Sequence, residues 1–218
     1  MSDAVILRPL RRGDYPTLVE MLRRMWYADP SMSETTARRL ATIDLHHCLS
    51  RSTIATVAER DGRVVGVILA RVDAAMPRWR QSPLNRHVRR MIGESLALPF
   101  SAEGRRGIRD AFDLVAVDRR LMRGLTPRYD AEIVLFLVDE RMRGQGVGGT
   151  LFDHVLARFH AAGARHYFLF TDTTCNVGFY DHRGLFRRRE ERGIHRDGSE
   201  DTYYLYEGTC VASATRMP

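Results

Sequence analysis

The sequence contains no lysine, because all 34 of its basic residues are arginine. This absence excludes chemistry that needs a lysine amine, such as a Schiff base, a lysine nucleophile or the phosphate-binding lysine of a nucleotide P-loop. Arginine instead supplies permanent planar cations suited to phosphate and carboxylate. The formal net charge of +7 therefore favours an anionic ligand, which could be a nucleic acid, a membrane surface or a phosphorylated small molecule.

Cysteine is also scarce, and Cys48, Cys175 and Cys210 lie far apart. They form neither a CxxC pair nor a disulfide framework, so we expect a reducing, cytoplasmic location. The eight histidines show no HxxxH or HxH spacing, and we expect no metal. No apolar run reaches the ~18 residues of a membrane span. The N-terminus also lacks the basic segment that opens a signal peptide.

The residues that are present describe a globular α/β chain. Hydrophobic residues make up 44% and charged residues 28%, which excludes a disordered or fibrous protein. Apolar segments predict strands over 4–8, 53–59, 64–72, 132–139, 166–171, 185–194 and 202–207. Helical spacing predicts helices over 14–27 with Asp14 as N-cap, and over 33–49, 147–162 and 175–182.

The stretch from Asp73 to Asp130 differs from the rest. Its apolar spacing predicts two or three amphipathic helices, and twelve arginines stand against seven acidic residues. We expect a single domain over residues 1–218, with a mixed sheet and with 73–130 as a helical insertion between the third and fourth strands. The insertion is expected to cover an acceptor site or to form a subunit contact, which leaves a homodimer open.

A glycine-rich turn joins the strand at 132–139 to the next helix. It reads Arg-Gly-Gln-Gly-Val-Gly-Gly from position 143 to 149. Glycines let the backbone turn sharply and approach a ligand, and free N–H groups at a helix start favour a phosphate. The GxxxxGK[ST] pattern fails for want of lysine, and the spacing does not match GxGxxG. A turn that only packs the helix on its strand is the plain alternative.

This segment resembles the [Q/R]-x-x-G-x-[G/A] signature of the GNAT N-acetyltransferase superfamily, and Cys175 to Phe186 is similar to that family's FY-x-x-x-GF segment. The resemblance implies a mostly antiparallel sheet in which the fourth and fifth strands splay apart around acetyl-CoA. It implies direct attack of an amine on the thioester in a ternary complex, without an acyl-enzyme. The insertion departs from the family, whose members usually have a short turn there.

The resemblance also implies residue roles. Pantetheine would pair with Phe136, Leu137 and Val138. The pyrophosphate would lie on the turn formed by Arg143, Gly144, Gln145, Gly146, Val147, Gly148 and Gly149. Tyr180 would protonate the CoA thiolate, and Glu132, eleven residues before Arg143, would be the general base. Asn176 would bind pantetheine, although many relatives place that residue where this chain has Thr173.

Two other function classes are open at this stage. A catalytically silent sensor of CoA or of an amine would keep the fold without the reaction. A nucleic-acid-binding protein is disfavoured, because the arginine pairs are interspersed with acids and lack interleaved aromatics. The acceptor, a small-molecule amine or a peptide, should lie between the first two helices (Trp26, Tyr27, Asp29), the insertion and the last strand pair.

Overall fold

A seven-stranded sheet forms the centre of the protein. The computed structural model describes residues 4–75, 85–125, 129–194 and 200–210. The strand order is β1-β2-β3-β4-β5-β7-β6, and only the β4–β5 pair is parallel. The strands are β1 (Ile6–Pro9), β2 (Ile54–Arg60), β3 (Arg63–Val72), β4 (Ala131–Val138), β5 (His166–Asp172), β6 (Phe186–Ile194) and β7 (Glu200–Thr209). The predicted mixed, mostly antiparallel sheet is confirmed.

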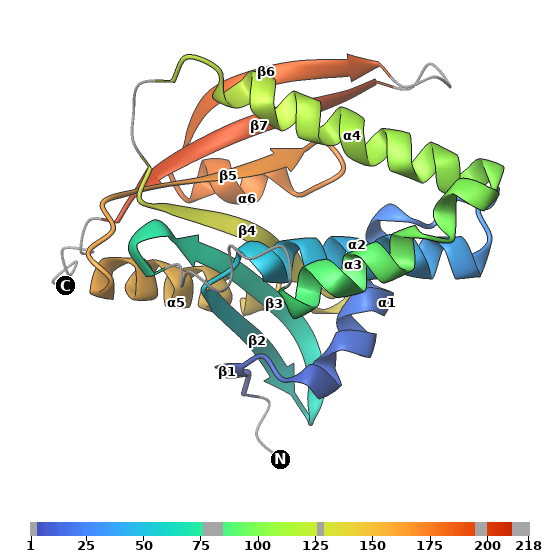
Figure 1. The fold of residues 1–218 in the computed structure, drawn as a ribbon. Coiled ribbons are helices and arrows are strands. Elements are labelled where there is room, and N and C mark those ends of the chain that lie inside the picture. Colours follow the sequence, from blue (N-terminus) through green and yellow to red (C-terminus); the bar gives the residue numbers. More distant parts are fainter. Residues whose placement is uncertain (1–3, 76–84, 126–128, 195–199, 211–218) are drawn as a thin grey trace, which may run out of the picture.

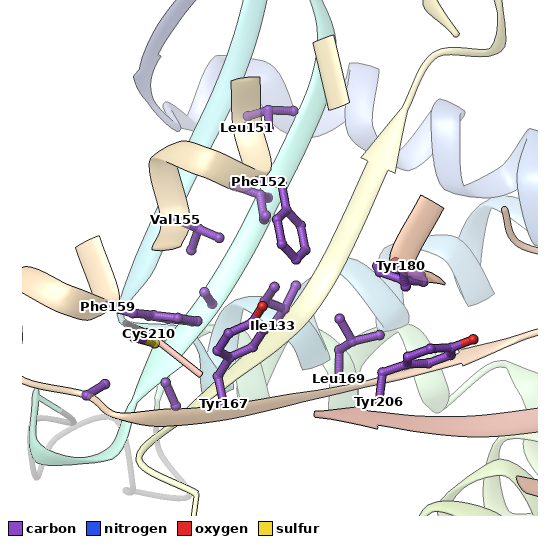
Figure 2. Close-up of a cluster of buried hydrophobic side chains, with 14 of the residues drawn as sticks. Ile133, Leu151, Phe152, Val155, Phe159, Tyr167, Leu169, Tyr180, Tyr206 and Cys210 are labelled. Atoms are coloured by element: carbon purple, nitrogen blue, oxygen red, sulfur yellow. The ribbon is translucent and has the colours of Figure 1, made fainter. Parts of the chain in front are cut away.

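Helices cover both faces of the sheet (Figure 1). On one face lie α5 (Val147–Ala161) and α6 (Val177–His182), whose apolar side chains share a core with β3, β5 and β7. Figure 2 shows this core, in which Phe152 and Phe159 of α5 both contact Tyr167. Phe152 also contacts Tyr180, which in turn contacts Tyr206. On the other face, α1 (Tyr15–Trp26) and α2 (Glu34–Arg51) pack against β2, β3 and β4.

The insertion is helical, as the sequence predicts. It contains α3 (Arg86–Ser95) and α4 (Ala102–Met122), with short 3₁₀ turns at η2 (Asp73–Ala75) and η4 (Leu98–Phe100). Helix α3 packs on α2, and α4 runs along β6 and β7 (Figure 1). Val117 and Leu121 of α4 are buried against Phe168 of β5 and Leu205 of β7. The insertion thus completes the layer that α1 and α2 begin.

The first turn of α4 is fastened to the first turn of α2. Glu103 accepts hydrogen bonds from the backbone N–H and the hydroxyl of Ser33 and from the hydroxyl of Thr36. Ser33 is also the N-cap of α2, since its Oγ accepts from the N–H of Thr36 at 3.3 Å. One carboxylate therefore fixes where the insertion lies relative to α2.

Asp14 occupies the predicted N-cap position of α1, but its side chain makes no cap hydrogen bond there. Instead, both carboxylate oxygens accept from Arg8 at 2.8 Å, and the Arg11 N–H donates at 2.7 Å. A guanidinium outcompetes a helix N–H because two charge-assisted bonds form at once. Asp197-Gly198, a turn sequence between the predicted strands at 185–194 and 202–207, lies outside the described residues.

Candidate acetyl-transfer site

Strands β4 and β5 pair over only part of their length. These strands pair only where Ala131–Ile133 meets Tyr167–Leu169. Beyond that point β4 remains paired with β3 and β5 with β7, while their facing edges part. The register shifts at Leu69/Ala70, opposite the stretch of β4 from Ile133 to Leu135. Such an irregularity bends a strand, so β4 turns away from β5 and leaves backbone hydrogen-bonding groups unpaired along this edge.

The glycine-rich turn lies at the open end of this edge. Gly144 and Gly146 have φ values of 75° and 80°, which most side chains rarely adopt. A Cβ added at either position would meet no atom within 4 Å. Gly146 is the N-cap of α5, and the first amides of a helix have no partner inside it. The turn therefore presents an open, electropositive backbone surface suited to an anion.

The next two glycines allow close packing. A Cβ at Gly148 would lie 3.4 Å from the Phe136 ring, and one at Gly149 would lie 3.0 Å from Arg183 Nη2. Phe136 also stacks against Phe152 and Phe179 on the α5 face. Small residues at these positions let the start of α5 lie directly over β4.

Tyr180 lies on α6, on the same face as α5. Its side chain is buried against Phe179 and Tyr206, with ring centroids 5.5 Å away in both cases. Burial raises its pKa well above 10, and the nearby Thr171 hydroxyl only partly offsets this shift. The phenol therefore keeps its proton at neutral pH, which a general acid requires.

Glu132 lies at the closed end of the splay, paired in register with Phe168. Only 2% of the residue is exposed. Arg51 Nη2 donates to both carboxylate oxygens at 2.7 and 2.9 Å, and Arg71 Nη2 lies 3.0 Å from Oε2. Its role as a base stays a prediction, and that role would require Glu132 to accept a proton while two guanidiniums hold its anion.

Comparison with known proteins identifies this arrangement. Residues 15–185 match the family model described as the acetyltransferase (GNAT) family. This chain is a GNAT-family protein. No curated protein matches it.

Solved GNAT-type enzymes share the fold. Ard1 from Thermoplasma volcanium is 19% identical with a TM-score of 0.51, over 96% of this chain and 99% of that one. The ribosomal-protein-S18-alanine N-acetyltransferase from Escherichia coli is 12% identical with a TM-score of 0.52, over 99% of each chain. Polyamine N-acetyltransferase from Drosophila melanogaster is 15% identical with a TM-score of 0.53, over 94% and 100%.

The remaining side chains predicted to bind the cofactor differ in availability. Arg143 is exposed, and its Nη2 lies 3.9 Å from Met25 Sδ and 3.6 Å from Glu140 Oε1. Gln145 is held by Arg60 and by the Arg141 carbonyl. Val147 is buried in the core, so only its backbone could meet a ligand. Leu137 is buried on the α1 and α2 face, and Val138 packs against the opposite core.

Asn176 and Thr173 can be told apart in this GNAT site. Asn176 is exposed at the start of α6, and its side chain makes no cap hydrogen bond. The hydroxyl of Thr173 donates to Asp201 at 3.0 Å and accepts from the Thr202 N–H at 3.2 Å. The amide of Asn176 is therefore the more available of the two.

Sequence reasoning missed a row of polar residues on α2. Asp44, Cys48 and Arg51 follow the i, i+4, i+7 spacing of one helix face, beside the buried Leu45 and Leu49. Tyr27 donates a hydrogen bond to Asp44, and burial raises the pKa of Asp44 to about 6. Burial also raises the pKa of Cys48 to about 12, so this thiol is no nucleophile. The spacing was visible in the sequence, but the partners were not.

Two further observations concern the described residues only. No helix among them is long and apolar enough to cross a bilayer. In the same ranges, no three histidine, cysteine or acidic side chains gather as a metal would require.

Proposed function

We propose that this GNAT protein transfers an acetyl group from acetyl-CoA to a primary amine, by direct attack within a ternary complex. The observation that carries the proposal is the parting of β4 from β5 next to the open glycine turn. An unpaired strand edge suits the amides of pantetheine, and the helix start beside it suits pyrophosphate. A cytoplasmic location belongs to the same proposal.

The binding roles follow from these positions. The backbone of Phe136 to Val138 would pair with pantetheine, and Asn176 would donate its amide. The N–H groups of Gly144 to Gly149 would hold the phosphates, with the exposed Arg143 adding charge. A ligand held at both ends in this way would place its thioester within the splay.

The proton balance of the reaction needs an acid near the sulfur. The amine nitrogen forms a bond to the carbonyl carbon, the carbon–sulfur bond breaks, and the thiolate takes a proton. Tyr180 stays protonated at neutral pH and would supply that proton, then regain it from solvent. Its place on the α5 face leaves the α1, α2 and α4 face for the amine.

The acceptor is best described by its reacting group. Of the similar enzymes named above, one is an N-acetyltransferase for a ribosomal-protein alanine and another is a polyamine N-acetyltransferase. We therefore propose a primary amine on a small molecule or a peptide N-terminus.

A thiol-release assay tests the proposal. Acetyl-CoA is mixed with the protein and with amines that include polyamines, amino acids, aminoglycosides and short peptides. At least one amine should give enzyme-dependent CoA release and an acetylated product by mass spectrometry. Binding of acetyl-CoA without release over the whole panel would favour the silent-sensor alternative.

A further inference from the structure

The insertion carries the Asp118 carboxylate on α4, on the face of the sheet that we propose for the amine. Asp118 lies on α4, one residue after Val117, which is buried against Phe168 of β5. Phe168 is the register partner of Glu132 at the closed end of the opening. Asp118 is partly exposed, and the charges of Arg51 and Glu132 both act on it. Helix α4 of the insertion therefore reaches the point where β4 and β5 part.

Asp118 differs from Glu132 in being uncommitted. Glu132 is held by Arg51 and Arg71 through contacts of 3.0 Å or less. Within the ranges that the structure describes, Asp118 makes no ion pair and no hydrogen bond. Its neighbours one turn away on α4 are Leu114, Val115, Leu121 and Met122, none of which carries a charge. Its oxygens are thus free to accept a proton.

The surroundings also suit proton transfer near neutral pH. Burial raises the pKa of Asp118 to about 7; Glu132 acts in the same direction, and Arg51 opposes it. The charge of Asp118 also acts on Tyr203 of β7, and Arg71 Nη2 lies 3.0 Å from Glu132 Oε2. A base is most effective when its pKa lies near the working pH.

We propose that Asp118 is the general base that takes a proton from the acceptor ammonium. The inference rests on the acetyl transfer proposed above. One N–H bond of the ammonium breaks and its proton goes to an Asp118 oxygen, which leaves the nitrogen lone pair free to attack the thioester. After attack, the nitrogen loses its second proton to water. Tyr180 gives its proton to the thiolate and regains one from solvent, and Asp118 returns its proton to solvent, so one proton is released overall. Acid and base thus act from opposite faces of the sheet.

The Arg51–Glu132–Arg71 cluster then has a positioning role. Two ion pairs hold the cluster together, and the positive charge of Arg51 keeps the pKa of Asp118 from rising further. Glu132→Gln would weaken this cluster and alter the pKa of Asp118, but it would not remove the base.

The test is the pH profile of kcat/KM for an amine that the wild-type protein acetylates. Wild-type kcat/KM should fall below about pH 7. Asp118→Asn should lower kcat/KM about 100-fold near pH 7.5 and should abolish the fall of kcat/KM below about pH 7. The difference from wild type should become smaller at high pH, where the amine itself is deprotonated. Asp118→Glu should restore an ionising limb. Asp113→Asn, the same charge change at an exposed position of α4, should match wild type.

Two results would overturn the inference. One is an Asp118→Asn enzyme that binds acetyl-CoA and keeps the wild-type profile. The other comes from NMR titration of the wild-type carboxyl carbons, which needs no acceptor. The signal that is lost in Asp118→Asn should titrate near pH 7, and a midpoint close to 4 would rule out the base. If the wild-type protein acetylates none of the amines, the proposed function is rejected. The NMR titration would still show whether the Asp118 carboxyl titrates near pH 7.

Discussion

Gly146 decides how closely an anion can approach the start of α5. A Cβ at this position would meet no atom within 4 Å, so a ligand has room to approach. A side chain would also have room, but the φ of 80° would strain the backbone of most residues. Asparagine and aspartate both tolerate this conformation, and they differ only in charge. The pair Gly146→Asn and Gly146→Asp therefore separates backbone strain from electrostatics.

Gly146→Asp should bind acetyl-CoA at least about tenfold more weakly than Gly146→Asn, because its carboxylate would face the phosphates. Isothermal titration calorimetry on both folded variants measures this difference. Equal affinities would place the phosphates elsewhere.

Tyr180 provides a second test at the scale of one atom. Tyr180→Phe removes only the hydroxyl from a ring already packed against Phe179 and Tyr206. We expect kcat to fall about 100-fold while the Kd for acetyl-CoA stays unchanged. Stopped-flow thiol detection and calorimetry check the two quantities. An unchanged kcat would assign the proton to solvent.

At this scale the sequence predicted backbone features better than side-chain partners. The glycine-rich turn before α5 was predictable, because four glycines within six positions are a local pattern. The roles of this turn and of Tyr180 follow from the family resemblance and stay predictions. The contacts of Arg51 and Arg71 with Glu132 were not predictable. Arg71 reaches Glu132 through the register of β3 with β4, and Arg51 reaches it from the end of α2. Asp118 could not be recognised as a candidate base for a similar reason. Its proposed role depends on where α4 packs, which the sequence does not show.

Among the elements, α4 depends on a glycine at its junction with η4. A Cβ at Gly104 would lie 2.2 Å from the Leu98 carbonyl oxygen, which belongs to the backbone and cannot swing away. Gly93 in α3 is exposed and would meet no atom within 4 Å. The same substitution should therefore have opposite effects in the two helices.

Gly104→Ala should destabilise the protein by about 1–3 kcal/mol through overpacking. Gly93→Ala should stabilise it by up to about 1 kcal/mol, because alanine is the better helix former. Urea unfolding of both variants gives the two signs, and a stabilised Gly104→Ala would mean that the junction has room.

The helices of the insertion were predictable, and their placement was not. Amphipathic spacing marked them in the sequence, but the spacing does not say which surface they cover. Glu103 on Ser33, and Val117 and Leu121 on the sheet, determine the placement. Apolar side chains also stay exposed there: Ile92, Leu96, Phe100, Phe112, Leu114 and Val115. A homodimer through this surface stays a prediction.

For the whole molecule, the Arg8–Asp14 pair gives folding stability a pH dependence. The hydrogen bonds from Arg8 hold the pKa of Asp14 below its usual value despite burial. An acid whose pKa is lowered on folding adds stability above its unfolded pKa of about 4 and loses it as the pH falls through the folded value.

Asp14→Asn should therefore lower the free energy of unfolding by about 2 kcal/mol at pH 7. The difference from wild type should shrink progressively below about pH 4. Urea titrations at several pH values measure it. Glu34→Gln, which breaks an exposed pair with Arg38, should change stability by only a few tenths of a kcal/mol and serves as the control. A deficit independent of pH would mean that Asp14 acts through packing alone.

The two ends of the insertion meet, since the Asp73 N–H donates to the Asp130 carbonyl at 3.0 Å and Val72 pairs with Ala131. In topological terms the whole insertion is the loop of a β-hairpin. Replacing this loop of roughly sixty residues by one of about four would halve its length about four times. The entropic cost of closing the loop would then fall by about 2 kcal/mol. Replacing the insertion by a short loop would, however, expose Phe168 and Leu205 and would remove α4 together with Asp118. Because its two ends are adjacent, the insertion could be transferred as a unit into a relative with a short loop between β3 and β4. The transferred insertion should provide the proposed base only if β5 and β7 of the recipient present apolar residues on which α4 can pack.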